Sequence, residues 1–151
     1  SYGASGERAG SAFMNKNTPA EDIRQAKYFT NHVIVSMHSG TEYTNYPNNR
    51  QKEFARAAID AGASLVIGHH PHWIQTTEKY KDGYIIYSLG NFVFDQMWSQ
   101  NTRKGAVAKI ILSRTGVESL DFLPVMIDDY AQPRPMTEKE AEKVNWLFEI
   151  E

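Results

Sequence analysis

The chain has 151 residues, 41% of them hydrophobic, and a net charge of −2, which fits one globular domain with its own core. Acidic and basic residues nearly balance without a Lys/Arg run, so nothing indicates a nucleic-acid or membrane surface. Cysteine is absent, which excludes a disulfide framework and a thiol nucleophile. Residues 1–4 resemble neither a signal peptide nor an initiator, so we expect the chain to begin inside a longer protein.

The first part of the chain predicts a loop, a helix and a strand. Residues 1–17 are rich in small polar residues without periodicity, which is typical of a loop. A capping box over residues 18–21 predicts a helix over about 19–30, with an inward stripe of Ile23, Ala26 and Phe29. The apolar run at 33–35 predicts a parallel strand that is buried on both faces and leads to His38.

A second strand is expected beside the first. Pro47 and Gly62 frame a helix over roughly 47–61, and residues 63–67 form another apolar run. A strand, helix and strand of this length predict a parallel crossover, which places both strands' carboxyl ends at one edge of the sheet. Open α/β sheets bind ligands at that edge, so His38 and Glu42 are candidate site residues.

Three histidines follow the second strand directly, in the segment Gly68-His69-His70-Pro71-His72. Pro71 disfavours helical geometry at the preceding residue, so we expect His70 and His72 to be extended and to point to one side. His69 should then face the other way, behind the ligands. Imidazole suits Zn, Mn, Fe, Ni or Co, so the pair predicts a metal site, and the alternative is a surface loop whose histidines bind no ligand.

The rest of the chain reads as scaffold with one further candidate. Asp82-Gly83 predicts a hairpin between strands at 73–80 and 84–89. Asn91 follows in a Gly-Asn pair and could present its amide to a ligand, although a plain turn explains the pair equally well. A second hairpin is expected over 104–113 and 117–127, and a break at 132–135 precedes a helix over 137–149. The buried stripe of that helix is expected to be Ala141, Val144 and Phe148, and Trp146 is expected in the core rather than at a ligand.

Three blocks together resemble one family. They are residues 38–43 (HSGTEY), 61–72 (AGASLVIGHHPH) and 87–95 (YSLGNFVFD), with Gln51 between the first two. Their order and spacing, over about residues 20–135, are similar to those of the bacterial capsule synthesis protein CapA family, also called PgsA and associated with poly-gamma-glutamate.

The resemblance implies a fold and a metal centre. The CapA family is related to the calcineurin-like metallophosphoesterases, which implies a mixed α/β (α+β) chain, part of a β-sandwich flanked by helices. Residues 1–151 would be a single partial domain, with the amino-terminal half of the sandwich missing. By the same resemblance, His38 and His70 share one divalent metal ion (Mn, Zn or Fe) and His72 binds a second. Glu42, His69 and Asn91 would then contact the substrate or support the ligands.

The sequence departs from the family pattern in two places. Ser39 stands where the CapA pattern usually has tryptophan. The superfamily's bridging aspartate and its Asn-His motif belong to the missing half, and Asn31-His32 lies at the wrong end of its strand to replace that motif. We therefore expect half of a two-metal site and no activity from this chain alone.

Two functions remain open at this stage. The first is a metal-dependent phosphoesterase-type hydrolase of capsule synthesis or export, and the second is a non-catalytic polymer-assembly component that keeps the fold. In both, the implied partners are an anionic polymer or phosphoester and other capsule-synthesis membrane proteins. The implied location is the extracytoplasmic cell surface, anchored through a segment outside this chain. A serine hydrolase is disfavoured because no Gly-x-Ser-x-Gly elbow is present.

Overall fold

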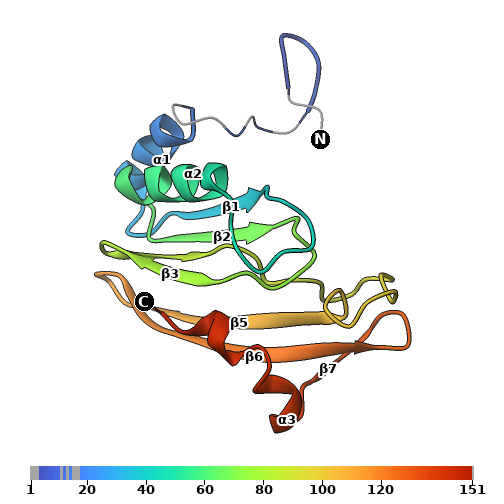
Figure 1. Ribbon diagram of the computed structural model, residues 1–151. Helices are drawn as coiled ribbons and strands as arrows, with labels where there is room; N and C mark the ends of the chain where they lie inside the picture. The colour runs from blue at the N-terminus through green and yellow to red at the C-terminus, as the bar shows by residue number, and fades with distance from the viewer. Residues whose placement is uncertain (1–3, 11, 13, 15–17, 151) are drawn as a thin grey trace.

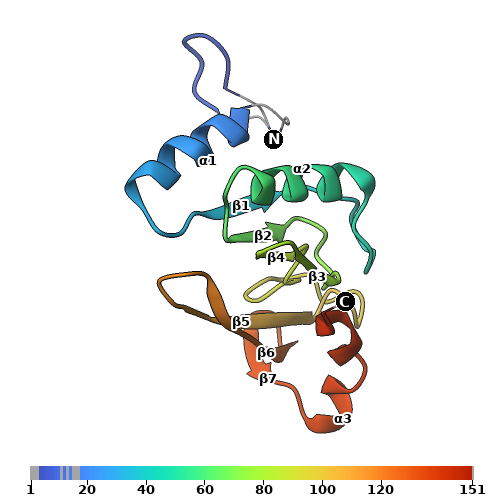
Figure 2. The same cartoon turned by 90° about the vertical axis from the view of Figure 1, so that its left-hand side faces the viewer.

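The protein is a mixed α/β structure with two sheets. The computed structural model describes residues 4–10, 12, 14 and 18–150. Figures 1 and 2 show the elements in layers, with helices α1 and α2 on the outer side of the first sheet, the second sheet on its other side, and helix α3 beyond that. The expected mixture of helices and paired sheets is confirmed at this level. The loop expected over residues 1–17 lies partly outside the described residues.

The first sheet carries the parallel unit that the sequence predicts. Its strand order is β1 (Ile34–His38), β2 (Leu65–His69), β4 (Gly83–Ile86) and β3 (Thr77–Tyr80). Strands β1, β2 and β4 run parallel, and β3 and β4 form the expected hairpin. The hairpin strands are shorter than predicted.

The prediction that β1 is buried on both faces is wrong. Strand β1 stands at the edge of the sheet in the described chain, and Ile34 is 52% exposed. An apolar run of this length indicates a hydrophobic strand, but it does not distinguish an edge strand from a central one.

Helices α1 (Thr18–Phe29) and α2 (Asn49–Asp60) pack against this sheet. Asn48 caps α2, and its side chain and that of Gln51 bond each other's backbone in a capping box. The core cluster joins buried residues of both helices to the strands: Ile23, Met37, Phe54, Ala55, Ala58, Ile59, Ala63, Val66, Ile85 and Tyr87. Phe29, the last residue of α1, is 81% exposed, so the predicted inward stripe of the helix does not extend to it. The box expected at residues 18–21 involves a side chain outside the described part.

The second sheet is a three-stranded antiparallel layer. It contains β5 (Lys104–Leu112), β6 (Val117–Asp128) and β7 (Gln132–Pro135), in that order. The hairpin of β5 and β6 is confirmed. Strand β7 was missed because its two prolines argue against a central strand, whereas an edge strand tolerates them.

The predicted C-terminal helix is interrupted. It begins as expected, since Glu140 accepts bonds from the backbone and hydroxyl of Thr137, but the segment divides into α3 (Glu138–Ala141) and a 3₁₀ turn, η1 (Asn145–Phe148). Val144 is buried, Ala141 and Phe148 are partly buried, and Trp146 is 41% exposed, so its predicted core position is wrong.

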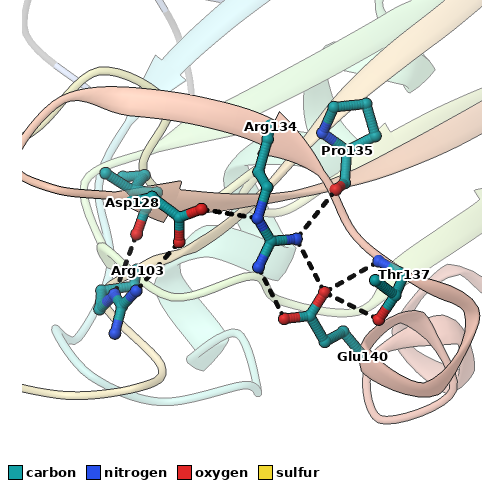
Figure 3. Close-up of polar contacts among 7 residues, drawn as sticks. Arg103, Asp128, Arg134, Pro135, Thr137 and Glu140 are labelled. Atoms are coloured by element: carbon teal, nitrogen blue, oxygen red, sulfur yellow. Dashed lines mark hydrogen bonds and ion pairs between the residues drawn. The ribbon is translucent and has the colours of Figure 1, made fainter.

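An arginine network fastens this segment to the second sheet. Figure 3 shows Arg134 of β7 between two carboxylates, donating to Asp128 at 2.6 Å and to both oxygens of Glu140 at 2.8 Å. Arg103 donates to the other oxygen of Asp128 at 3.2 Å. The paired geometry of guanidinium and carboxylate therefore holds α3 beside β6 and β7.

Candidate functional site

Two loops meet at the carboxyl edge of the first sheet. Strand β1 ends at His38 and β2 at His69, and these two residues are partners in the parallel register. Gly68 allows β2 and the segment after β4 to lie close together, because a Cβ there would stand 2.0 Å from the carbonyl oxygen of Tyr87. The chain thus delivers the His38 loop and the three-histidine loop to the same place, as the strand pattern predicts.

The backbone of the histidine loop differs from the prediction. His70 and His72 have φ angles of 102° and 61°, in the left-handed region, so the expected extended geometry is wrong. Tyr43 in the facing loop is also left-handed, with φ of 61°. Proline disfavours the helical region for the residue before it, but this local preference is overridden here by the contacts of the loop. Such residues cost about 1–3 kcal/mol each and persist where surrounding contacts hold them.

Hydrogen bonds between the two loops supply part of that hold. The backbone N–H of Ser39 donates to the carbonyl of His69 at 3.0 Å, and that of Tyr43 donates to Pro71 at 2.9 Å. These bonds continue the parallel pairing beyond the strands. They hold the loops in register at the residues that carry the rings.

Three imidazoles converge on one another. The ring centroids of His38 and His70 lie 5.0 Å apart, and those of His70 and His72 lie 6.2 Å apart. Glu42 places a carboxylate oxygen 3.8 Å from Nε2 of His70. Partial burial, followed by the neighbouring histidines, lowers the pKa of His38, and burial lowers that of His69. Both shifts favour the neutral imidazole, the form that binds metals.

Asn91 determines which ring nitrogen of His72 keeps a lone pair. Its amide donates to the backbone carbonyl of Thr102 at 2.9 Å, and a carbonyl can only accept, so Oδ1 of Asn91 must face His72. That oxygen lies 2.9 Å from Nδ1 of His72, which therefore carries the proton. In the neutral ring Nε2 is then left with its lone pair. A metal-binding histidine is typically oriented in this way by its second nitrogen.

Aromatic side chains surround this histidine. The ring of Tyr43 stacks on that of His72 with 6.0 Å between their centroids, and the ring centroid of Phe94 lies 5.2 Å from that of His72. Trp98 contacts Tyr43 edge-on at 5.0 Å. Tyr43 follows the candidate Glu42 in the motif block of residues 38–43, and this position could have identified Tyr43 as a site residue. Nothing in the sequence singled out Trp98.

His32 lies apart from the cluster, as expected. It precedes β1, at the opposite end from His38, and its ring bonds Ser64 at 3.0 Å and the carbonyl of Ser113 at 2.6 Å. Both ring nitrogens are thereby used in joining the β5–β6 hairpin to the first sheet. This histidine is structural.

The donor types at the strand ends fit a divalent metal ion. Neutral imidazole and carboxylate suit Zn, Mn and Fe. Within residues 4–10, 12, 14 and 18–150, however, no three His, Cys, Asp or Glu side chains lie close enough together to hold one ion. The arrangement is a pair, His38 and His70, with the oriented ring of His72 beside it.

The fold and site define an α/β protein whose histidine loops lie at the carboxyl edge of a parallel sheet. The model of the family described as bacterial capsule synthesis protein PGA_cap matches residues 1–96. The chain belongs to this bacterial capsule synthesis family.

Named relatives agree with the family match. The chain is 41% identical over 138 residues to the capsule biosynthesis protein CapA of Bacillus anthracis, covering 89% of this chain and 33% of that protein. It is 40% identical over 128 residues to the PGA biosynthesis protein CapA of Bacillus subtilis (strain 168), covering 85% and 33% respectively. An uncharacterized protein, y4sH, of Sinorhizobium fredii is 41% identical over 78 residues, covering 50% and 17%. The chain thus spans about a third of the length of the two CapA proteins.

Among the described residues, none of the helices combines the length and the apolar character that a bilayer crossing requires.

Proposed function

We propose that this chain is the histidine-bearing part of a CapA-type protein that synthesises or exports poly-gamma-glutamate, and that its strand-end histidines bind divalent metal. The family match and the two CapA relatives support the capsule role. The single observation that carries the metal site is the convergence of His38, His70 and His72, with Nε2 of His72 left as an acceptor.

The site is proposed to take its ions in two places. His38 and His70 are the closer pair and supply the donors of the first position, and Glu42 lies beside His70 as a supporting residue. His72 supplies Nε2 to a second position, with Asn91 holding its other nitrogen. His69 and Asn91 support the ligands from behind. Paired divalent ions, when bound, polarise a phosphoryl oxygen and lower the pKa of a bound water, which is the chemistry of a metallophosphoesterase-type fold.

Metal affinity tests this directly. We expect the purified chain to bind Mn²⁺ or Zn²⁺ in calorimetric titration, and alanine variants of His38, His70 or His72 to lose at least about tenfold in affinity. His32→Ala is the matched control, because it removes a histidine that bonds only protein groups in the described structure. Equal loss in all four variants, or no loss in the three site variants, would contradict the proposal.

A second measurement separates hydrolysis from polymer handling. A full-length CapA relative loaded with Mn²⁺ should cleave a generic phosphodiester if the site is catalytic, and the variant equivalent to His72→Ala should not. Bound metal without turnover would assign the site to polymer assembly.

A further inference from the structure

A small pocket lies beside the histidine loop, because Trp73 lines it, and none of the residues of the histidine site does. It has a volume of about 40 Å³ and is partly open to solvent. Since one water molecule occupies about 10–15 Å³ on this measure, the pocket has room for about three heavy atoms. Its lining comes from the β1–α2 loop, the loop after β2, the start of β5 and the C-terminal segment, in the residues Asn45, Trp73, Ile74, Asn101, Lys104, Lys143, Val144, Trp146 and Leu147. Figure 2 shows that C-terminal segment beside the second sheet.

Two ammonium groups share this pocket without a neutralising carboxylate. Neither Lys104 nor Lys143 takes part in any ion pair found among the described residues. The partner of Lys104 is neutral, the amide oxygen of Asn101 at 2.8 Å. Burial and the charge of Lys143 lower the pKa of Lys104. Lys104 is partly buried and Lys143 is exposed, and two like charges that line one pocket favour an anion between them.

A further hydrogen-bond donor, and the lack of acidic residues in the lining, support the same conclusion. The indole N–H of Trp73 is buried and has no acceptor within the described chain. A buried donor without a partner costs about 1–3 kcal/mol, so such a group indicates an interaction that is absent here. Trp73 belongs to the lining of the pocket, which contains two lysines and no acidic residue.

We propose that this pocket binds a carboxylate group of an anionic polymer. A carboxylate has three heavy atoms, which matches the volume, and it accepts bonds from ammonium groups. The polymer assignment rests on the proposed capsule function, whereas the anion preference rests on the lining alone. Trp73 follows His72 directly, and the ring of Tyr43 contacts both, at 6.0 Å and 6.5 Å. A chain with a carboxylate on every unit can therefore reach the pocket and the histidines together.

Calorimetric titration with a short γ-glutamyl oligomer tests the pocket. The chain is stripped of metal and then dialysed free of chelator, so that neither metal at the histidines nor a competing carboxylate plays a part. We expect Lys104→Gln and Lys143→Gln each to weaken binding about tenfold, the size of one charge-assisted hydrogen bond. Lys109→Gln, an exposed position on the same strand, is the charge-matched control and should change the affinity less than about twofold. No binding to the unmodified chain, or equal loss in all three variants, overturns the inference.

A measurement on the unmodified chain guards against misfolded variants. The chain has three tryptophans, so a proton–nitrogen NMR spectrum resolves their indole signals, which Trp73→Phe assigns. The oligomer should shift the Trp73 signal, and the same oligomer with its carboxylates amidated should not. An unmoved Trp73 signal, or a shift by the amidated oligomer, overturns the inference. If free glutamate binds as tightly as the oligomer, the polymer assignment is wrong.

The two proposals fail separately. Loss of oligomer binding in the lysine variants with wild-type metal affinity in the histidine variants supports the pocket and refutes the metal site. The opposite pattern refutes the pocket and supports the metal site.

Discussion

Replacing Gly105 by alanine should weaken the contact between the second sheet and the segment that carries Asn91. Gly105 forms a bridge with Gly90, and a Cβ at position 105 would stand 1.8 Å from the carbonyl oxygen of Asn91. That oxygen belongs to the backbone, so the strand must move away by roughly 1.6 Å to reach an ordinary contact of 3.4 Å. The adjoining bond from the N–H of Ala106 to Leu89, at 2.9 Å, then weakens as well. Overpacking of this kind costs about 3 kcal/mol or more, and the lost bond about 1 kcal/mol.

Urea unfolding followed by circular dichroism measures this cost. Gly116→Ala is the matched control, since nothing lies within 4 Å of a Cβ at that position, and it should stay within about 0.5 kcal/mol of the wild type. Because Asn91 moves with its backbone, Gly105→Ala should also lower metal affinity at the His72 side. A free energy of unfolding equal to that of Gly116→Ala would refute the reasoning, because it would mean that the strands are not in contact as described.

Three further predictions concern other parts of the chain. Gln51→Leu should lower the free energy of unfolding by about 2–4 kcal/mol in urea titrations, because it leaves the N–H of Asn48 and the amide oxygen of Gln75 unpaired. The control Gln25→Leu, at an exposed position, should have little effect. An equal free energy of unfolding in the two variants would contradict this prediction. Arg134 and Thr137 lower the pKa of Glu140, so its stabilising effect is present above the unfolded-state pKa near 4.3 and is lost as the pH falls below it. The stability difference between wild type and Glu140→Gln should accordingly shrink from about pH 6 to pH 3, and a constant difference would argue against the ion pair. His32→Ala should cost about 1–3 kcal/mol through its two lost bonds, and an unchanged unfolding midpoint would show that they contribute nothing.

The parts of the fold that could be predicted from the sequence are those with strong local signals. The strand, helix and strand unit followed from two apolar runs and a helix framed by Pro47 and Gly62, and the Asp82-Gly83 hairpin followed from its turn. The edge position of β1 could not be predicted, because it depends on which strands are neighbours. The short β7 was hidden by Pro133 and Pro135, whose missing N–H groups are harmless at a sheet edge.

The meeting of the histidine loops was predictable from the sequence, whereas the geometry of those loops was not. Parallel strands place their carboxyl ends together whatever follows them, so the meeting of His38 with His70 needed only the strand pattern. The left-handed backbone of His70 depends on contacts between loops, which no local rule describes. The roles of Thr102, Phe94 and Trp98 likewise arise only when the second sheet and its preceding loop are in place.

The second sheet therefore helps to orient His72 although none of the three converging histidines belongs to it. Asn91 is held by the carbonyl of Thr102, which stands two residues before β5, and β5 can approach so closely only because position 105 is glycine. The orientation of the Asn91 amide then determines which nitrogen of His72 keeps a lone pair. A chain of contacts thus runs from the antiparallel sheet through the side chain of Asn91 to one imidazole. Substitutions in β5 that shift this strand should alter metal affinity without touching a histidine, whereas substitutions at its exposed distal end should not.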